Sequence, residues 1–593
     1  MSRATLDEAI TAEVIRSALA VAVEEASIVV VRASHSTFIQ EGADACAALL
    51  DARGQLIAQS MATSLIHGSS LRCSLPSLLE DYPAAQMQPG DVYAMNDPYR
   101  GGIHANDILI FKPIFAAERV VFFAGTLIHV ADLGGVAAGG LASLATDTFA
   151  EGLVLPPVRL YAAGEPVADI ARILARNSRM PGAVMGDISA LVAGVNVAGT
   201  RLDEVLATHG AGTVVRVADE YLDYAEVRMR DELRRLANGT YRGTFTIDSD
   251  GIAADRQFEV VVTATVDDGS IDLDFAGTAD QSGGAINSSF SQTLSGVIFA
   301  VRCFVDPTIP MNEGCFRPVH VQIPEGTITN PRPPAACGGR VVTVAAAIEA
   351  ILAAFSKARP DLAVASSGLI HVLTMAGVGA GVGGDDPGSK AASSWLTMLY
   401  EFGGIGARRG SDGPDATGAF YLGGRSTIPQ IEPIELQYPV RVRRTALRRD
   451  SGGAGTWRGG LGVEMAIEVL ADVTLSVRGD RILLPPPGVD GGRAGAPGFG
   501  RIEHADGTIE RLAPRQSAVH LTAGDVFVIG TSGGGGLGPP QDRSPELVAA
   551  DVTEARVSIA AAADDYGVVI DERGRVDASA TRLRRATMQG DRR

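Results

Sequence analysis

The chain has 593 residues, of which 46% are hydrophobic and 20% charged, so it is long enough for roughly two to four globular domains. Its net charge of −18 argues against a nucleic-acid partner, because phosphate binding needs a concentrated basic face. Five scattered cysteines argue against a disulfide scaffold, and neither a signal peptide nor an uncharged apolar run of about 18 residues is apparent. We therefore expect a cytoplasmic protein without a membrane partner.

Hydrophobic periodicity predicts the elements of the first part of the chain. Apolar residues recur at helical spacing near the N-terminus, and short apolar runs separated by glycine turns follow, as is typical of strands. The expected elements are a helix over residues 6–32, a hairpin over 44–60 that turns at Asp51–Gly54, a strand, glycine turn and strand over 91–115, a strand over 119–135, and two helices over 187–237 that close near Gly210 and Gly239.

Strands with Asp-Gly turns are predicted after residue 239, a helix near 341–361, and short strands broken by glycine and proline over 430–540. One of these breaks, "TSGGGGLGPP", lacks the Gly-Lys-Ser/Thr ending of a phosphate loop, so a turn or a backbone wall near a ligand is the favoured interpretation.

Helices and strands segregate in blocks, which indicates an α+β fold with several domains, built from helical blocks plus mixed and antiparallel β-sheets. We expect four segments. They are an N-terminal α+β metal-site domain over 1–238, a central α+β domain over 239–430, a β-rich, glycine-rich domain over 431–545, and a C-terminal element with a loose basic tail over 546–593.

The pattern His-x-x-Asp occurs twice among only nine histidines, each time beside glycines and apolar strand residues. It comprises His104 and Asp107, and then His129 and Asp132. At a strand end that enters a turn, this spacing can direct both side chains into one cleft. Two such ends on adjacent strands would supply a nitrogen and oxygen ligand set without thiolates, which suits Zn²⁺, Mn²⁺ or Fe²⁺.

Glu41 and Asp44 could add oxygen ligands to this site. His67 and Asp97 could contact the ligands, without binding the metal, and so orient them. A bound metal would polarise a carbonyl or lower the pKa of a bound water. Taken singly, each His-Asp pair is more often a surface hydrogen bond, and Asp97 before Pro98 is equally explained as a turn cap. A non-catalytic assembly subunit, whose histidines satisfy core carbonyls, is therefore a further alternative.

Six motifs, spread in order along nearly the whole chain, resemble the hydantoinase B/5-oxoprolinase family. The resemblance implies a subunit that works with a hydantoinase A-type ATPase partner, which uses ATP to phosphorylate the substrate. The motifs are "NDPYRGGIHANDILI", "GTLIHVADLGG", "EGLVLPPVRL", "NEGCFRPVHVQIPEGT", "DSGGAGTWRGGLG" and "TSGGGGLGPP".

The resemblance implies ATP-dependent opening of a cyclic amide, such as a hydantoin, 5-oxoproline or a lactam, by a metal-bound water. The alternative within the family is a subunit of an ATP-dependent ketone carboxylase of the acetone or acetophenone type. The family's metal site falls on His104, Asp107 and His129, with Asp44 or Glu41. Asp132 or Asp97 is expected to accept the proton from water.

Overall fold

The computed structural model describes residues 3–61, 63–253, 255–378, 394–418, 428, 430–571 and 573–590. The chain divides into two compact units, which are described separately below. The first consists mainly of Met1–Gly243 and Val260–Ile351, and the second mainly of Thr244–Glu259, Leu352–Phe420 and Ile431–Arg593. Both contain helices and sheets, so the predicted multi-domain α+β fold is confirmed.

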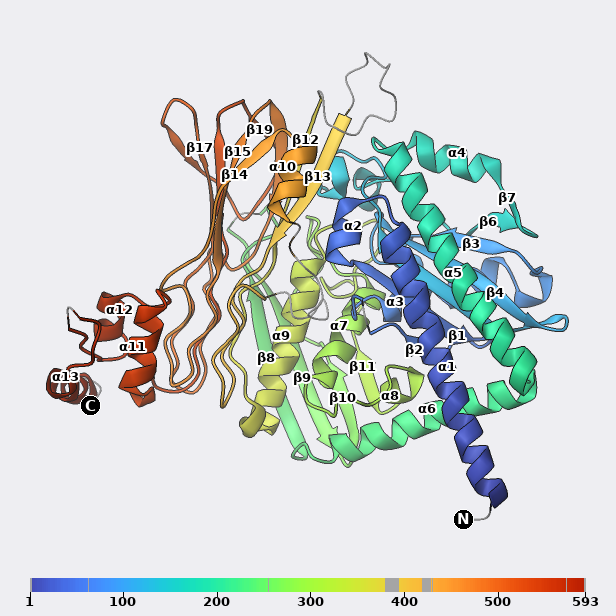
Figure 1. Ribbon diagram of the computed structural model, residues 1–593, viewed down its shortest axis with the longest axis horizontal. Helices are drawn as coiled ribbons and strands as arrows, with labels where there is room; N and C mark the ends of the chain where they lie inside the picture. Colours follow the sequence, from blue (N-terminus) through green and yellow to red (C-terminus); the bar gives the residue numbers. More distant parts are fainter. Residues whose placement is uncertain are drawn as a thin grey trace. The chain divides into compact units, whose positions relative to one another are not determined.

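A seven-stranded antiparallel sheet forms the centre of the first unit, with the strand order β2-β1-β5-β4-β3-β6-β7 (Figure 1). Its central strands are almost completely buried, which explains their continuous apolar runs in the sequence. The strands are β1 (Ala45–Asp51), β2 (Leu56–Gln59), β3 (Val92–Met95), β4 (Asp107–Ala116), β5 (Arg119–His129), β6 (Val158–Ala162) and β7 (Glu165–Pro166).

Helices cover both faces of this sheet because neighbouring side chains on a strand point to opposite faces. On β5, Gly125 faces Leu71 of helix α3, whereas the Thr126 hydroxyl donates a hydrogen bond to the Leu191 carbonyl of helix α5 (3.1 Å). The helices of this part of the chain are α1 (Arg3–Ala33), α2 (Thr37–Gly42), α3 (Gly68–Asp81), α4 (Ala168–Arg176), α5 (Pro181–His209) and α6 (Ala211–Leu233).

The predicted N-terminal elements are confirmed. The first helix spans Arg3–Ala33, and the hairpin turns where the Asp51 carboxylate accepts hydrogen bonds from the backbone of Arg53 and Gln55. Gly210 separates α5 from α6 with a φ of 78°, a left-handed value that favours glycine.

A four-stranded sheet, ordered β11-β10-β9-β8, contains the strands predicted after residue 239. Asp268 and Gly269, with φ values of 34° and 84°, form the tight turn between β9 and β10. The elements here are β8 (Gly239–Ile247), β9 (Phe258–Asp267), β10 (Ser270–Asp274), α7 (Phe290–Arg302), α8 (Glu313–Phe316), β11 (Val319–Gln322) and α9 (Val341–Ala358).

The second unit contains two further sheets, with the orders β13-β12-β16-β19 and β14-β15-β20-β17-β18. Their apolar side chains share one core cluster. The elements are β12 (His371–Val378), β13 (Ser394–Glu401), α10 (Ile431–Gln437), β14 (Val440–Leu447), β15 (Val463–Val469), β16 (Val473–Arg478), β17 (Phe499–Glu503), β18 (Ile509–Arg511), β19 (Arg515–Leu521) and β20 (Val526–Gly530).

In the second unit, the glycine-rich segments around Gly453, Gly460 and Gly534 pack against one another backbone to backbone. We call these segments the glycine bundle. Gly534 N–H donates to the Gly460 carbonyl (2.9 Å), and Gly453 N–H donates to the Gly534 carbonyl (2.8 Å). A Cβ on Gly534 would lie 2.1 Å from the Ile405 carbonyl oxygen, and one on Gly536 would lie 2.3 Å from the Ala454 carbonyl oxygen. The segment "TSGGGGLGPP" therefore packs through its backbone, and its sequence-based interpretation as a turn or a backbone wall near a ligand stays a prediction.

The C-terminal region contains α11 (Pro545–Thr553), α12 (Ile559–Asp564) and α13 (Ala578–Gly590). The sequence favoured a loose tail after Arg573, but most of that tail forms α13. The Asp577 carboxylate accepts hydrogen bonds from the backbone of Ser579 and Ala580 at its start, and the Arg585 guanidinium donates to the Tyr566 and Arg543 carbonyls. These contacts between distant segments explain why the basic tail is ordered.

Within the part of the chain that the structure describes, two helices, α5 and α9, are long and apolar enough by composition to cross a membrane. Over its most apolar window, α9 is 83% buried within the protein, and α5 is 56% buried. Both helices also supply core residues, so they are explained as core helices. Short 3-10 turns complete the described structure: Ala84–Gln86, Pro98–Arg100, Ala138–Gly140, Thr148–Ala150, Pro360–Leu362 and Pro540–Asp542.

Candidate metal centre

The candidate metal centre lies in the first unit, where β4 begins and β5 ends. The two strands are antiparallel neighbours, and Asp107 is the direct cross-strand partner of His129. His104 lies one turn before β4, and its carbonyl accepts a hydrogen bond from Asp107 N–H (3.0 Å). The strand register therefore brings together three residues from two separate His-x-x-Asp motifs.

The side chains of His104, Asp107 and His129 face a common point. The distance from His104 Nε2 to Asp107 Oδ2 is 3.3 Å, and that from His129 Nδ1 to Asp107 Oδ1 is 3.0 Å. The two imidazole nitrogens are 3.0 Å apart, and one donor atom from each residue lies within 4.8 Å of the others. This buried set of two nitrogens and a carboxylate fits Zn²⁺, Mn²⁺ or Fe²⁺.

The protonation states of these side chains also suit a metal ligand set. Burial and the nearby positive charge of Arg340 together lower the pKa of His104 to about 3, so the imidazole is neutral at physiological pH. Burial acts to raise the pKa of Asp107, but His104 and Arg340 outweigh it and hold that pKa well below its usual range. A neutral imidazole and an ionised carboxylate are the forms that bind a cation.

Arg340 is part of this site, although the sequence analysis did not single it out. Its Nη2 lies 3.0 Å from Asp107 Oδ2, and both side chains are buried. Glu151, which is also buried, holds the loop before Arg340 by accepting backbone N–H bonds from Cys337 (3.0 Å) and Gly338 (2.5 Å). The sequence carries one signal for Arg340, which is its position directly before the predicted helix. A cation beside the positive N-terminal end of a helix opposes the helix dipole, so an anion is expected nearby.

Asp44 is connected to the group through His67. His67 Nε2 lies 3.1 Å from Asp44 Oδ1, and His67 precedes the first residue of α3. Burial acts to raise the pKa of Asp44, but His67 and His129 together lower it below its usual value. Asp107 and His129 also influence this pKa, so Asp44 lies within electrostatic range of the metal ligands. Glu41 lies on α2, and its role as a ligand stays a prediction.

The two carboxylates predicted to accept a proton occupy different surroundings. Asp132 is fully buried and accepts hydrogen bonds from the Arg179 backbone (2.7 Å), the Arg179 guanidinium (2.8 Å) and Gly139 N–H (3.1 Å). Asp97 is partly exposed and accepts a hydrogen bond from Tyr99 N–H (2.9 Å), as a turn cap does. Both roles as proton acceptors stay predictions.

Two asparagines hold the loops that present the ligands. The Asn106 amide donates to the Val130 carbonyl (3.2 Å), while Val130 N–H donates to the Asn106 carbonyl (2.8 Å), so the residues next to Asp107 and His129 are tied together. The Asn96 amide donates to the carbonyls of Ala105 and Leu153. This rigidity fixes the positions of both imidazoles.

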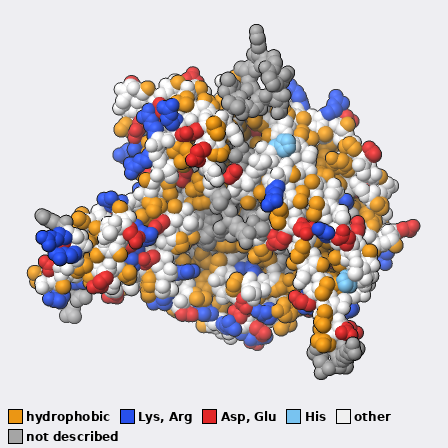
Figure 2. All heavy atoms as spheres, in the orientation of Figure 1, with side chains coloured by type: hydrophobic (Ala, Val, Ile, Leu, Met, Phe, Trp, Pro, Cys, Tyr) orange, Lys and Arg blue, Asp and Glu red, His pale blue; other side chains and the backbone are white. Residues whose placement is uncertain are grey.

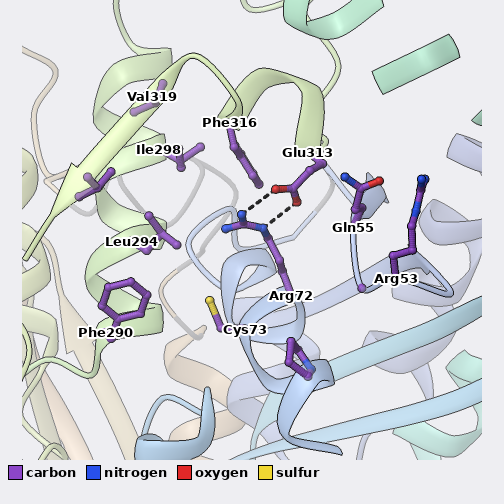
Figure 3. A pocket seen from close by; sticks show the side chains of 13 residues that line it. Arg53, Gln55, Arg72, Cys73, Phe290, Leu294, Ile298, Glu313, Phe316 and Val319 are labelled. Carbon is purple, nitrogen blue, oxygen red and sulfur yellow. Dashed lines mark hydrogen bonds and ion pairs between the residues drawn. The ribbon is translucent and has the colours of Figure 1, made fainter. Parts of the chain in front are cut away.

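A pocket of about 460 Å³ lies farther along α3, and none of the three candidate ligands lines it (Figure 3). Its most polar feature is a bidentate salt bridge, in which Arg72 Nε and Nη2 each donate a hydrogen bond to the Glu313 carboxylate at 2.6 Å. Phe290, Leu294 and Ile298 of α7 form an apolar side. This bridge links α3, which carries Arg72, to α8, which carries Glu313.

Comparison with known proteins shows which family the chain matches. The Hydantoinase B/oxoprolinase family profile matches residues 8–540. The chain is 31% identical over 592 residues to caprolactamase subunit beta of Pseudomonas jessenii, which covers 97% of this chain and 99% of that protein.

Two solved structures share the fold. The crystal structure of ATP-dependent caprolactamase from Pseudomonas jessenii has a TM-score of 0.87 and 28% identity, over 97% of this chain and 99% of that one. The nucleotide-free structure of acetone carboxylase has a TM-score of 0.89 over 98% of this chain and 83% of that one, but its identity of 22% shows the fold alone. The chain belongs to the hydantoinase B/oxoprolinase family.

Proposed function

We propose that the protein is the B-type subunit of an ATP-dependent hydrolase that opens a cyclic amide, and that a hydantoinase A-type partner subunit supplies the ATPase. The observation that carries this proposal is the buried His104, Asp107 and His129 group in a chain so similar to a caprolactamase subunit. The name of that relative, a subunit beta, supports a heteromeric complex. A cytoplasmic location is part of the same proposal.

In the proposed reaction, the partner transfers the terminal phosphoryl group of ATP to the amide oxygen, which makes the ring carbon electrophilic. Water adds to that carbon and the C–N bond breaks, which leaves an acyl phosphate. A second water hydrolyses the acyl phosphate and releases phosphate, so a cyclic amide, ATP and two waters give an amino acid, ADP and phosphate. A divalent metal held by the three ligands would activate the water or polarise the carbon–oxygen bond. The protein itself has to hold the ligands, keep them deprotonated and accept a proton.

The chain's own residues divide these tasks. His104 offers a neutral nitrogen, His129 offers a second ring nitrogen, and Asp107 stays ionised because Arg340 and His104 outweigh its burial. Asp97 is the better candidate for the proton acceptor, because it is partly exposed, whereas Asp132 is buried and engaged by Arg179. Asp44, held by His67, is proposed as a further oxygen ligand.

The proposal is tested by ATP-dependent phosphate release from this chain purified together with its ATPase partner. Hydantoin, 5-oxoproline and caprolactam are compared with acetone and acetophenone, each with and without bicarbonate. We expect one of the cyclic amides to stimulate phosphate release to the same extent with and without bicarbonate. Release that requires a ketone, with bicarbonate carbon in the product, would replace the proposal with the carboxylase alternative, for which the shared fold is the present support.

Replacing Arg340 with methionine should lower metal-dependent activity by about 10- to 100-fold, because Asp107 then loses the partner that fixes one of its oxygens. The measurement is kcat of the complex at saturating metal, so that weaker metal binding does not contribute. Arg340→Lys should recover part of the loss, since it keeps the charge but not the planar guanidinium. Unchanged kcat in Arg340→Met would show that Asp107 is positioned without it.

A further inference from the structure

Helix α1 has two apolar faces on opposite sides. One is buried in the core of the first unit and includes Ile15, Leu19 and Val30. The other consists of five exposed residues, which we call the α1 stripe: Leu6 (46% exposed), Ile10 (54%), Val14 (50%), Val21 (51%) and Ile28 (46%). At about 100° per residue, the stripe occupies an arc of roughly 80° on the side facing away from the core.

The stripe continues onto the first turns of α1, where Ala12 packs against the core but is only partly buried. From Leu6 to Val14 no side chain is buried, and the first buried residue of the helix is Ile15. Figure 1 shows these first turns extending past α6, and Figure 2, in the same orientation, shows hydrophobic side chains at the surface there. A helical segment this short is marginally stable by itself in water, so a partner along the stripe would stabilise it.

We propose that the α1 stripe is covered by the α1 stripe of a second copy of this chain, packed antiparallel across a two-fold axis near Ser17. Ser17 is exposed and small, and it lies near the middle of the stripe. Val14 and Val21 flank it closely, while Leu6 and Ile28 lie equally far from it on either side. An antiparallel crossing at Ser17 therefore places Val14 near Val21 and Leu6 near Ile28 in both copies, which is the self-complementarity that a two-fold interface requires.

The charges beside the stripe favour the same orientation. Asp7 is exposed in the first turns of α1, and Arg32 is exposed in its last turn. An antiparallel pair brings the Arg32 end of one copy to the Asp7 end of the other, and it also aligns the helix dipoles favourably. A parallel pair would place Asp7 against Asp7. The ends of α1 thus complement each other only when the two helices run in opposite directions.

The arrangement is tested by cysteine crosslinking of the full chain. Ser17→Cys is made together with Cys303→Ser, which removes the exposed native cysteine, and Ser189→Cys on the exposed side of α5 serves as the matched control. Under mild oxidation, we expect most of the Ser17→Cys chain to form a covalent dimer and the Ser189→Cys chain to remain monomeric on non-reducing gels. Equal crosslinking of the two variants would overturn the proposal.

A second measurement does not depend on a new thiol. The unmodified chain should elute at twice its mass of 61.5 kDa in light scattering, and Val14→Lys with Val21→Lys should elute at the monomer mass with an unchanged circular dichroism spectrum. Lysine is tolerated at these positions because they are exposed and helical. A monomeric unmodified chain that pairs through the stripe with the ATPase subunit instead would contradict the proposal.

Discussion

Replacing His129 with alanine is expected to weaken the binding of one divalent cation per chain by at least about 100-fold, and to remove the metal-dependent activity of the complex. The reason is geometric. His129 Nδ1 lies 3.0 Å from both Asp107 Oδ1 and His104 Nε2, so its loss leaves two donors at a site that needs three or more. Replacing a residue that hydrogen-bonds to a metal ligand typically lowers metal affinity or activity by about 10- to 100-fold. Loss of a ligand itself should lower metal affinity at least that much.

The measurement is titration of the metal-free chain with Mn²⁺ and Zn²⁺ by calorimetry, with metal content checked by mass spectrometry. His320→Ala, an exposed histidine on β11, is the matched control and should bind like the unmodified chain. Removing the metal with a chelator should abolish activity, and adding it back should restore it. Stoichiometric binding that survives in His129→Ala would show that the three residues are not the metal site.

Gly534→Ala should prevent the second unit from folding, with a loss of stability of about 4 kcal/mol or more. The added methyl carbon would lie 2.1 Å from the carbonyl oxygen of Ile405, a backbone atom that cannot rotate away. Moving Ile405 would also disturb the Gly460 N–H bond to its carbonyl (2.8 Å). Overlap of this kind spreads through the glycine bundle because each segment contacts the next through its backbone.

Soluble yield and thermal unfolding check this expectation. Gly212→Ala, at an open position on α6 with nothing within 4 Å of the added carbon, is the matched control and should be neutral or slightly stabilising. If Gly534→Ala unfolded within about 2 °C of the unmodified chain, the glycine bundle would have to be far more adaptable than its backbone contacts indicate.

Elements with a strong local signal were predictable from the sequence. The helical spacing of apolar residues predicts α1, and the Asp-Gly turn predicts the β9–β10 hairpin, because both signals act over a few residues. The C-terminal helix α13 was not predicted. It has no continuous apolar face to signal it, and contacts such as Arg585 with the Tyr566 carbonyl hold it in place.

In the candidate site, too, some residues are indicated by a local sequence signal and others only by contacts between distant segments. His104, Asp107 and His129 stand out because a repeated spacing beside strand ends is visible in one sequence. Arg340 and Glu151 do not stand out, because their roles depend on a loop that folds back from far along the chain onto Asp107. Sequence spacing identifies groups that can bind a metal, but only tertiary packing shows which groups position them.

The direct pairing of Asp107 with His129 has a consequence for local unfolding of the central sheet in solution. Since the two side chains occupy opposed positions of one ladder, a cation bound by both would act as a crosslink that resists separation of β4 from β5. Amide hydrogen exchange along these strands should then slow when metal is added, while exchange in the second unit stays unchanged. Occupancy of the site would thereby set the local unfolding free energy of the central sheet.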